Sequence, residues 1–170
     1  MRKFLLLMLL ALSFSTLKSQ SLRKVSGVKY LGASYGYQIN GNNFNIHYDG
    51  YLKKNFAFYG QLSYENYSEN SFKMNDFYLT AGGKYFFGLP VNNLFIGGSL
   101  GAYFGKQYAK HNILNESSES WTWGIHFSPI VEYYVISNLS VYLAYSQYFD
   151  LNNDFRNYHF SFNLGVTYQF

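Results

Sequence analysis

The sequence predicts an all-β protein, an eight-stranded antiparallel up-and-down transmembrane β-barrel, from three observations. Residues 158–170 alternate apolar and polar side chains over thirteen positions, which is the period of a strand. A strand that crosses a bilayer needs ~9–11 residues, whereas soluble strands average ~5–6. The chain is 22% aromatic and 13% charged, and a lipid-facing wall with aromatic girdles explains both values. The third observation is an export signal at the start.

Residues 1–19 are expected to be a secretory signal peptide, and 20–170 the outer-membrane β-barrel domain. The chain begins with Arg2 and Lys3, continues with an apolar run over 4–12, and then becomes rich in serine and threonine. This order of a basic start, an apolar centre and a small-residue end is typical of a signal peptide. The apolar run is too short for a spanning helix, which needs ~20 residues.

The charge and cysteine content exclude several functions. Thirteen basic residues become ten when Arg2, Lys3 and Lys18 leave with the signal peptide, against nine acidic residues. The mature net charge is then about +1, so the basic pI does not indicate nucleic-acid binding. The sequence contains no cysteine, which excludes disulfides, thiol catalysis and thiolate metal sites.

The first four expected strands alternate along most of their length. The first is joined to the second by a turn-forming Asn-Gly-Asn-Asn stretch, and the two form a hairpin. The third begins after a tight Lys-Lys-Asn reversal and is followed by a polar loop. The fourth ends before Pro90, which cannot donate to a strand ladder. These strands cover 31–39, 44–53, 56–65 and 76–87.

The last four expected strands have less uniform patterns. The fifth alternates apolar residues with glycine and serine, and small inward residues suit a narrow lumen. The sixth places Trp121, Trp123 and Pro129 on its outward face, where the proline is expected to cause a bulge or a local loss of pairing. The seventh follows a Ser-Asn turn, and the eighth is the C-terminal stretch. Their ranges are 94–107, 121–134, 139–146 and 158–170.

The connections alternate between brief and longer, which predicts the orientation in the outer membrane of a Gram-negative bacterium. Such barrels have short periplasmic turns and longer outer loops, so both termini are expected in the periplasm. The expected partners are outer-membrane lipid and the barrel-insertion machinery, because closing strands of such barrels typically end on an aromatic residue such as Phe170. The brief connections are 53–55, 88–93 and 135–138, and the longer ones are 40–43, 66–75, 108–120 and 150–157.

Strand parity places eight titratable side chains in the lumen. An eight-stranded barrel is just wide enough to be filled by side chains or to hold one small ligand, so a conducting pore is not expected. Three inward histidines with several carboxylates suggest a metal site, but buried charges must find partners in any polar core. We expect a hydrogen-bonded plug with no metal and no cofactor. The eight residues are His47, Asp49, Glu65, Asp76, Lys84, His126, Glu132 and His159.

His126 and Ser128 resemble the catalytic pair of the outer-membrane lipid A deacylase, a histidine two residues before a serine. That enzyme needs the pair to face lipid and an acidic residue to orient the histidine. Here parity points both side chains inward. Pro129 replaces the expected asparagine, and no acid stands at the family's spacing, although Glu132 is near. We therefore expect no enzymatic activity and assign no catalytic residue.

The outward aromatic residues are expected to face the membrane and its interfaces, although glycan stacking is an alternative. Near strand ends, the better candidates for contacts outside the bilayer are Tyr30, Tyr108, Trp121 and Phe155.

Several short motifs along the mature chain together carry a resemblance to a known family. They are 93–102 with Gly105, Trp123-Gly124, 132–134 with Leu139, Asp154 and 165–170, extended by 59–64 and 83–85. With these motifs the chain resembles the TraO family of conjugative-transposon transfer proteins from Bacteroides-type bacteria. The resemblance implies an outer-membrane component of a conjugative apparatus, with no catalytic residues to carry over and no direct binding of nucleic acid. A barrel this narrow would assemble or anchor other transfer proteins.

The expected function is that of a small outer-membrane barrel with a structural or interaction role, which the resemblance places in a conjugative transfer apparatus. Two alternatives stay open. One is a general surface barrel that serves adhesion or envelope stability through its outer loops. The other is a lipid A-modifying hydrolase that uses His126 and Ser128.

Overall fold

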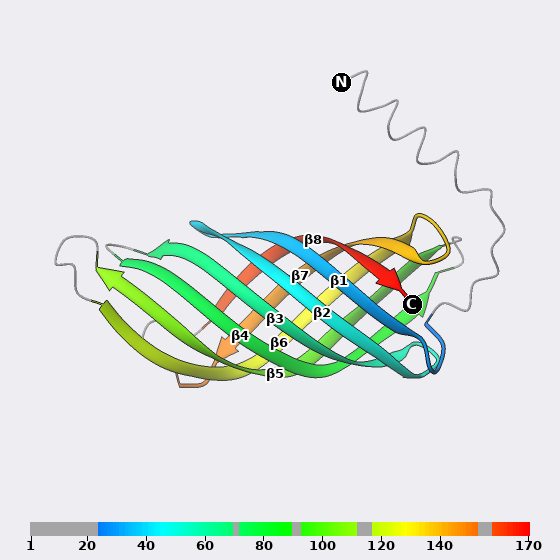
Figure 1. The fold of residues 1–170 in the computed structure, drawn as a ribbon, viewed down its shortest axis with the longest axis horizontal. Coiled ribbons are helices and arrows are strands. Elements are labelled where there is room, and N and C mark those ends of the chain that lie inside the picture. Colours follow the sequence, from blue (N-terminus) through cyan, green and yellow to red (C-terminus); the bar gives the residue numbers. More distant parts are fainter. Residues whose placement is uncertain (1–23, 70–71, 90–92, 112–116, 153–157) are drawn as a thin grey trace, which may run out of the picture.

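Eight antiparallel strands close into a single barrel in the computed structural model (Figure 1). The structure describes residues 24–69, 72–89, 93–111, 117–152 and 158–170. The predicted signal peptide lies outside the described residues. Each strand pairs with its neighbours in the sequence and β1 pairs with β8, so the fold class is confirmed. The strands are β1 (Lys29–Gln38), β2 (Gly41–Lys53), β3 (Phe56–Glu69), β4 (Phe72–Gly88), β5 (Leu94–His111), β6 (Ser117–Tyr134), β7 (Leu139–Asp150) and β8 (Tyr158–Gln169).

Several strands are longer at one end of the barrel than the sequence predicts. Within the stretches 66–75 and 108–120, expected to be loops, the described residues belong to paired strands: Tyr67 faces Met74 in β4, and Tyr108 faces Glu119 in β6. The inward side chains of Tyr67, Met74 and Ala109 pack together there, so alternation persists beneath a polar composition. The expected turn at 40–43 is likewise shorter, because Gly41 already pairs with Gln38.

Pro129 interrupts the pairing between β6 and β7, as the sequence predicts. The pairs Phe127–Gln147 and Ile130–Ala144 keep one register, but Ser128 and Pro129 have no partners on β7. Proline lacks the N–H that the ladder would use. The result is a local loss of pairing without a bulge.

The outer wall is an apolar surface. Leucines around its circumference are more than half exposed, including Leu62, Leu100 and Leu164. A soluble protein rarely exposes a continuous apolar patch of this extent. This ring of exposed apolar side chains, called the apolar belt below, matches the lipid-facing band of a transmembrane barrel. None of the described residues forms a helix long and apolar enough to cross a membrane.

Glycine makes room inside the narrow lumen. At Gly101 in β5, an added Cβ would lie 2.6 Å from the Tyr59 hydroxyl oxygen and 2.5 Å from the Ala81 carbonyl oxygen. Tyr59 can extend into the lumen because this wall position has no side chain. The small inward residues of β5 therefore leave space in the lumen for a bulky side chain from β3.

Candidate functional site

The eight titratable side chains predicted to face the lumen are all buried. They come from five of the eight strands and lie at different heights, so the lumen is filled by separate polar clusters rather than one site. Parity is therefore a reliable guide to which face each residue takes. The partners of each side chain depend on strand register.

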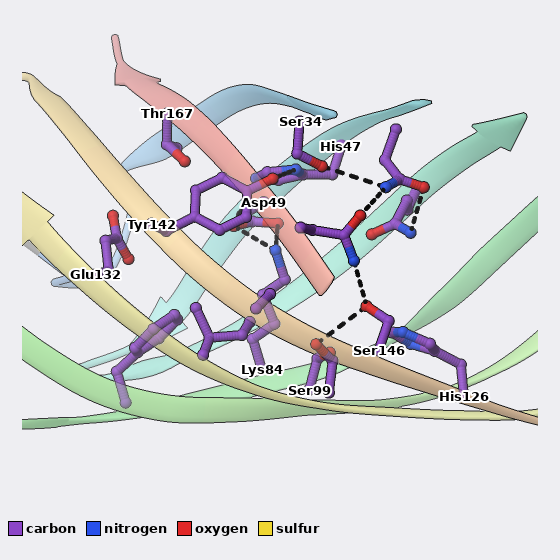
Figure 2. Close-up of a pocket in the computed structure, with 17 residues that line it drawn as sticks. Ser34, His47, Asp49, Lys84, Ser99, His126, Glu132, Tyr142, Ser146 and Thr167 are labelled. Carbon is purple, nitrogen blue, oxygen red and sulfur yellow. Dashed lines mark hydrogen bonds and ion pairs between the residues drawn. The ribbon is translucent and has the colours of Figure 1, made fainter. Parts of the chain in front are cut away.

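The central cluster joins β2 to β4 across the lumen (Figure 2). Lys84 Nζ donates to both carboxylate oxygens of Asp49, at 2.8 and 3.0 Å. His47 Nε2 lies 3.8 Å from Asp49 Oδ2. A buried carboxylate is costly unless it is paired and hydrogen-bonded, and Lys84 supplies both conditions.

A second cluster lies toward the end of the barrel opposite the termini. His159 in β8 lies between two carboxylates, with Nε2 3.3 Å from Glu65 Oε2 and Nδ1 3.4 Å from Asp150 Oδ2. Its ring stacks on Tyr148 at 4.5 Å between centroids and 4° between planes. The stacked tyrosine ring and the two flanking carboxylates together fix the position of the imidazole across the lumen.

Asp76 anchors the neighbouring wall of this second cluster. Its Oδ2 accepts hydrogen bonds from the hydroxyls of Tyr67 at 3.0 Å and Tyr78 at 2.6 Å, and from Gln107 Nε2 at 3.2 Å. Multiple donors stabilise a buried carboxylate. These long side chains also fill the space that a channel would need.

A third cluster closes the end where β1 begins and β8 ends, and the sequence did not predict it. Lys24, which precedes β1, is only 1% exposed, and its Nζ lies 2.5 Å from Glu132 Oε2. The ammonium also lies 3.5 Å from the centroid of the Phe86 ring and donates to the Tyr51 hydroxyl at 3.1 Å. Burial lowers the pKa of Lys24, while Glu132 acts in the opposite direction.

The backbone around Lys24 is also held in place. Its N–H donates to the Tyr30 hydroxyl at 3.1 Å, and its carbonyl accepts from the Asn55 N–H at 2.7 Å. The residue has a φ of 53°, an uncommon value for a side chain other than glycine. The segment before β1 is thus fixed across the mouth of the barrel.

The space left between these clusters is small. A cavity of about 30 Å³ lies in the centre, lined by residues that include Asp49, Lys84 and His126. A cavity needs roughly 10–15 Å³ for each water. The cavity has room for a few waters at most, not for a solvated path.

His126 and Ser128 are both buried in the lumen, as parity predicts. His126 Nδ1 lies 2.9 Å from the Tyr59 hydroxyl, whereas Ser128 Oγ accepts from Ser146 Oγ at 3.3 Å. The structure shows no hydrogen bond between the two side chains. The pair therefore lacks the nucleophile–base contact and the access to lipid that the deacylase resemblance requires.

The three inward histidines contact tyrosines rather than one another. Within the described part of the chain, no group of three or more His, Asp or Glu side chains is arranged to hold an ion. Each inward histidine instead contacts a tyrosine ring or hydroxyl.

The aromatic candidates for outside contacts have different positions. Tyr108 and Trp121 are exposed on the outer wall, near the end opposite the termini. Tyr30 is buried at the mouth near the termini, where it accepts a hydrogen bond from the Tyr134 hydroxyl at 3.1 Å. The expectation that Tyr30 makes contacts outside the bilayer is wrong, because its position in the alternation of β1 directs its side chain into the lumen. Phe155 lies outside the described residues.

The closed eight-stranded wall, apolar belt and filled lumen are those of small outer-membrane β-barrels. No protein-family model and no curated protein matches the chain. Among solved structures, the N-terminal β-barrel domain of OprF from Pseudomonas aeruginosa is similar at 15% identity and TM-score 0.65, covering 85% of this chain and 98% of that one. Neisserial surface protein A, NspA, is similar at 16% identity and TM-score 0.65, covering 85% of this chain and 98% of that one.

The attachment invasion locus protein Ail of Yersinia pestis is also similar, with 16% identity, a TM-score of 0.60, and coverage of 86% of this chain and 100% of that one. At these identities the likeness establishes the fold.

Proposed function

We propose that this chain is a non-conducting outer-membrane barrel with a structural or interaction role, acting through the rim opposite its termini. The filled lumen is the observation that carries the proposal. Three polar clusters, built on Lys24, Lys84 and His159, occupy successive levels between the two mouths. What remains for function is the outer wall and the rim.

The outer membrane is the proposed location because lipid is the solvent that the apolar belt requires. Phe170 supports recognition by the barrel-insertion machinery: it is 62% exposed, and its N–H donates to the Lys29 carbonyl at 3.1 Å beside the closing β1–β8 seam. Cell fractionation of the full chain tests this location. Recovery in the soluble periplasm would contradict it.

Conductance in planar lipid bilayers tests the closed lumen. We expect purified protein to insert without stepwise current increases, because buried ion pairs block the path. A reproducible unit conductance from folded, inserted barrels would contradict the proposal. Porins, whose wider barrels leave an aqueous channel, reconstituted alongside would show that the assay detects a pore.

We also propose a non-catalytic role, supported by the inward placement of His126 and Ser128. The test is mass spectrometry of lipid A from cells that express the wild type or His126→Ala. We expect identical lipid A in both and in cells without the protein. Deacylated lipid A that depends on His126 would instead establish the hydrolase alternative.

For the partner, we propose proteins of a conjugative transfer apparatus, with the TraO-like motifs as the support. The alternative is a general surface barrel for adhesion or envelope stability. Crosslinking and pull-down from the native outer membrane distinguishes them, with a tag placed between residues 111 and 117. Recovery of transfer proteins favours conjugation. Recovery of the barrel alone, once insertion is confirmed, favours the surface barrel.

A further inference from the structure

The rim opposite the termini is uneven, and its lowest point is the β1–β2 hairpin. β1 ends at Gln38, whose partner on β8 is Ser161. β8 begins at Tyr158, three residues before Ser161. Its first residues, Tyr158–Phe160, therefore extend beyond the end of β1 and pair with β7 alone. On the other side β3 continues beyond the hairpin, and its Ser68 N–H donates to the Asn40 carbonyl at 3.0 Å. The wall therefore has a notch at the tip of the β1–β2 hairpin. In Figure 1 this hairpin does not reach as far along the barrel axis as β5 and β6 do.

A cavity of about 180 Å³ occupies the notch. The cavity is lined both by side chains that point into the lumen and by side chains that point outward at the rim. It therefore connects the lumen at this end with the outside of the barrel. An engineered cavity of roughly 150 Å³ binds benzene, which indicates space for one six-membered ring. The lining residues are Gln38, Ile39, Asn40, Tyr67, Ser68, Tyr158, His159 and Phe160.

Gln38 is an unpartnered polar group at this cavity. The side chain is 2% exposed, and neither Oε1 nor Nε2 makes a hydrogen bond. Among the described residues, the other buried carboxamides each bond through at least one atom; Asn43 Nδ2, for example, donates to Ser161 Oγ at 2.9 Å. A buried polar group without a partner is destabilising, and a ligand in the notch would provide the missing donor and acceptor.

The chemistry of the lining selects the class of ligand. The Gln38 carboxamide offers a donor and an acceptor side by side, which matches a pair of adjacent hydroxyls. Tyr158 is 66% exposed at the outer side of the notch, and its ring provides an apolar surface. The one titratable imidazole, His159, is already engaged by Glu65 and Asp150. Among the described residues, the site therefore presents amide and aromatic groups without an uncommitted cation that would favour phosphate or carboxylate.

We propose that this notch binds one neutral sugar residue, with adjacent ring hydroxyls on the Gln38 carboxamide and the ring face against Tyr158. The sugar comes either from the carbohydrate of the surrounding lipopolysaccharide or from a glycan outside the cell. The inference names a ligand for the interaction role proposed above and rests on that role. Membrane insertion and a closed lumen are measured separately, so the failure of sugar binding is distinguishable from failure of that role.

Saturation-transfer NMR on full-length protein in phospholipid nanodiscs tests the site, with glucose, galactose, mannose and N-acetylglucosamine as probes. We expect transfer to the ring protons of at least one probe. Gln38→Leu should weaken binding by at least about tenfold, through loss of the hydrogen bonds to the ligand. Because leucine removes an unpaired polar group while keeping the approximate volume, this variant should fold at least as well as the wild type.

Tyr158→Ala should weaken the same signal, with Tyr168→Ala as its matched control. Both tyrosines are outward on β8, but Tyr168 is near the opposite end and pairs with Leu31. No transfer to any probe, or transfer that is unchanged in folded Gln38→Leu, would overturn the proposal. Repeating the experiment in nanodiscs that contain the native lipopolysaccharide identifies the source. Loss of probe binding there indicates lipopolysaccharide carbohydrate, and retained binding indicates an external glycan; both support the sugar site.

Discussion

Replacing Lys24 with methionine tests how the segment before β1 is held across the mouth of the barrel. Methionine keeps an unbranched side chain among the aromatic rings but removes the ammonium that lies 2.5 Å from Glu132. The Glu132 carboxylate then keeps the hydrogen bond that the Ser140 hydroxyl donates to it at 2.5 Å. Removing one partner of a buried ion pair costs ~3–5 kcal/mol because the other charge stays buried without compensation. We expect the free energy of unfolding to fall by this amount.

Urea-induced unfolding in phospholipid vesicles, followed by tryptophan fluorescence, measures the change. Trp121 and Trp123 are exposed on the lipid-facing wall, so their emission reports exit from the membrane. Adding Glu132→Gln to Lys24→Met removes both charges and should restore most of the stability, since replacing both partners is often neutral. Lys106→Met is the matched control, because Lys106 pairs with Glu119 on the exposed surface, where ion pairs contribute little.

Two results would refute this reasoning. One is a single variant within ~1 kcal/mol of the wild type, the size of an ordinary substitution. The other is a loss of the same size in the double variant, which would show that packing of the lysine stem, not charge, holds the segment.

Further predictions concern the wall and use the same unfolding assay. Leu100→Arg puts a charge on the 61% exposed lipid-facing side of β5 and should cost ~2–4 kcal/mol, whereas Tyr158→Arg near the rim should cost ~0–1 kcal/mol; equal costs would place the belt elsewhere. Gly101→Val overpacks the lumen against Tyr59 and the backbone and should cost ~1–3 kcal/mol. Gly60→Ala is the control, because nothing lies within 4 Å of an added Cβ, and it should leave the urea midpoint of unfolding unchanged. A Gly101→Val variant as stable as the wild type would mean that the strands move apart to accommodate the valine.

The barrel and the face of each inward charge were predictable because both depend on a period of two. Alternation in 158–170 continues through the structure of β8, and His47 or Glu132 needs no tertiary information to be assigned inward. The extended hairpins were missed because 66–75 and 108–120 are mostly polar in composition, which hides their few inward apolar residues. The strand pairing and the packing of Tyr67 against Met74 and Ala109 show that the described residues there remain in strands.

The contacts of the candidate sites were not predictable, for a different reason. Lys24 lies in an irregular segment with no periodicity, and its partner is 108 residues away. Likewise, the Lys84–Asp49 pair depends on the register of β2, β3 and β4 together. The notch at Gln38 depends on a difference in length between neighbouring strands, and strand ends are the least certain part of any sequence-based prediction.

The interruption at Pro129 has a mechanical consequence for the cylinder. Along most of its circumference, adjacent strands are joined by regular backbone ladders. At Ser128 and Pro129 this ladder is missing on the β7 side, and the hydrogen bond from Ser146 Oγ to Ser128 Oγ bridges the gap. Sliding of β6 against β7 is therefore resisted least at this level. We expect bending under lateral bilayer pressure to concentrate there, and amide protons of β7 that face the gap to exchange with solvent deuterium ahead of those elsewhere in the strand.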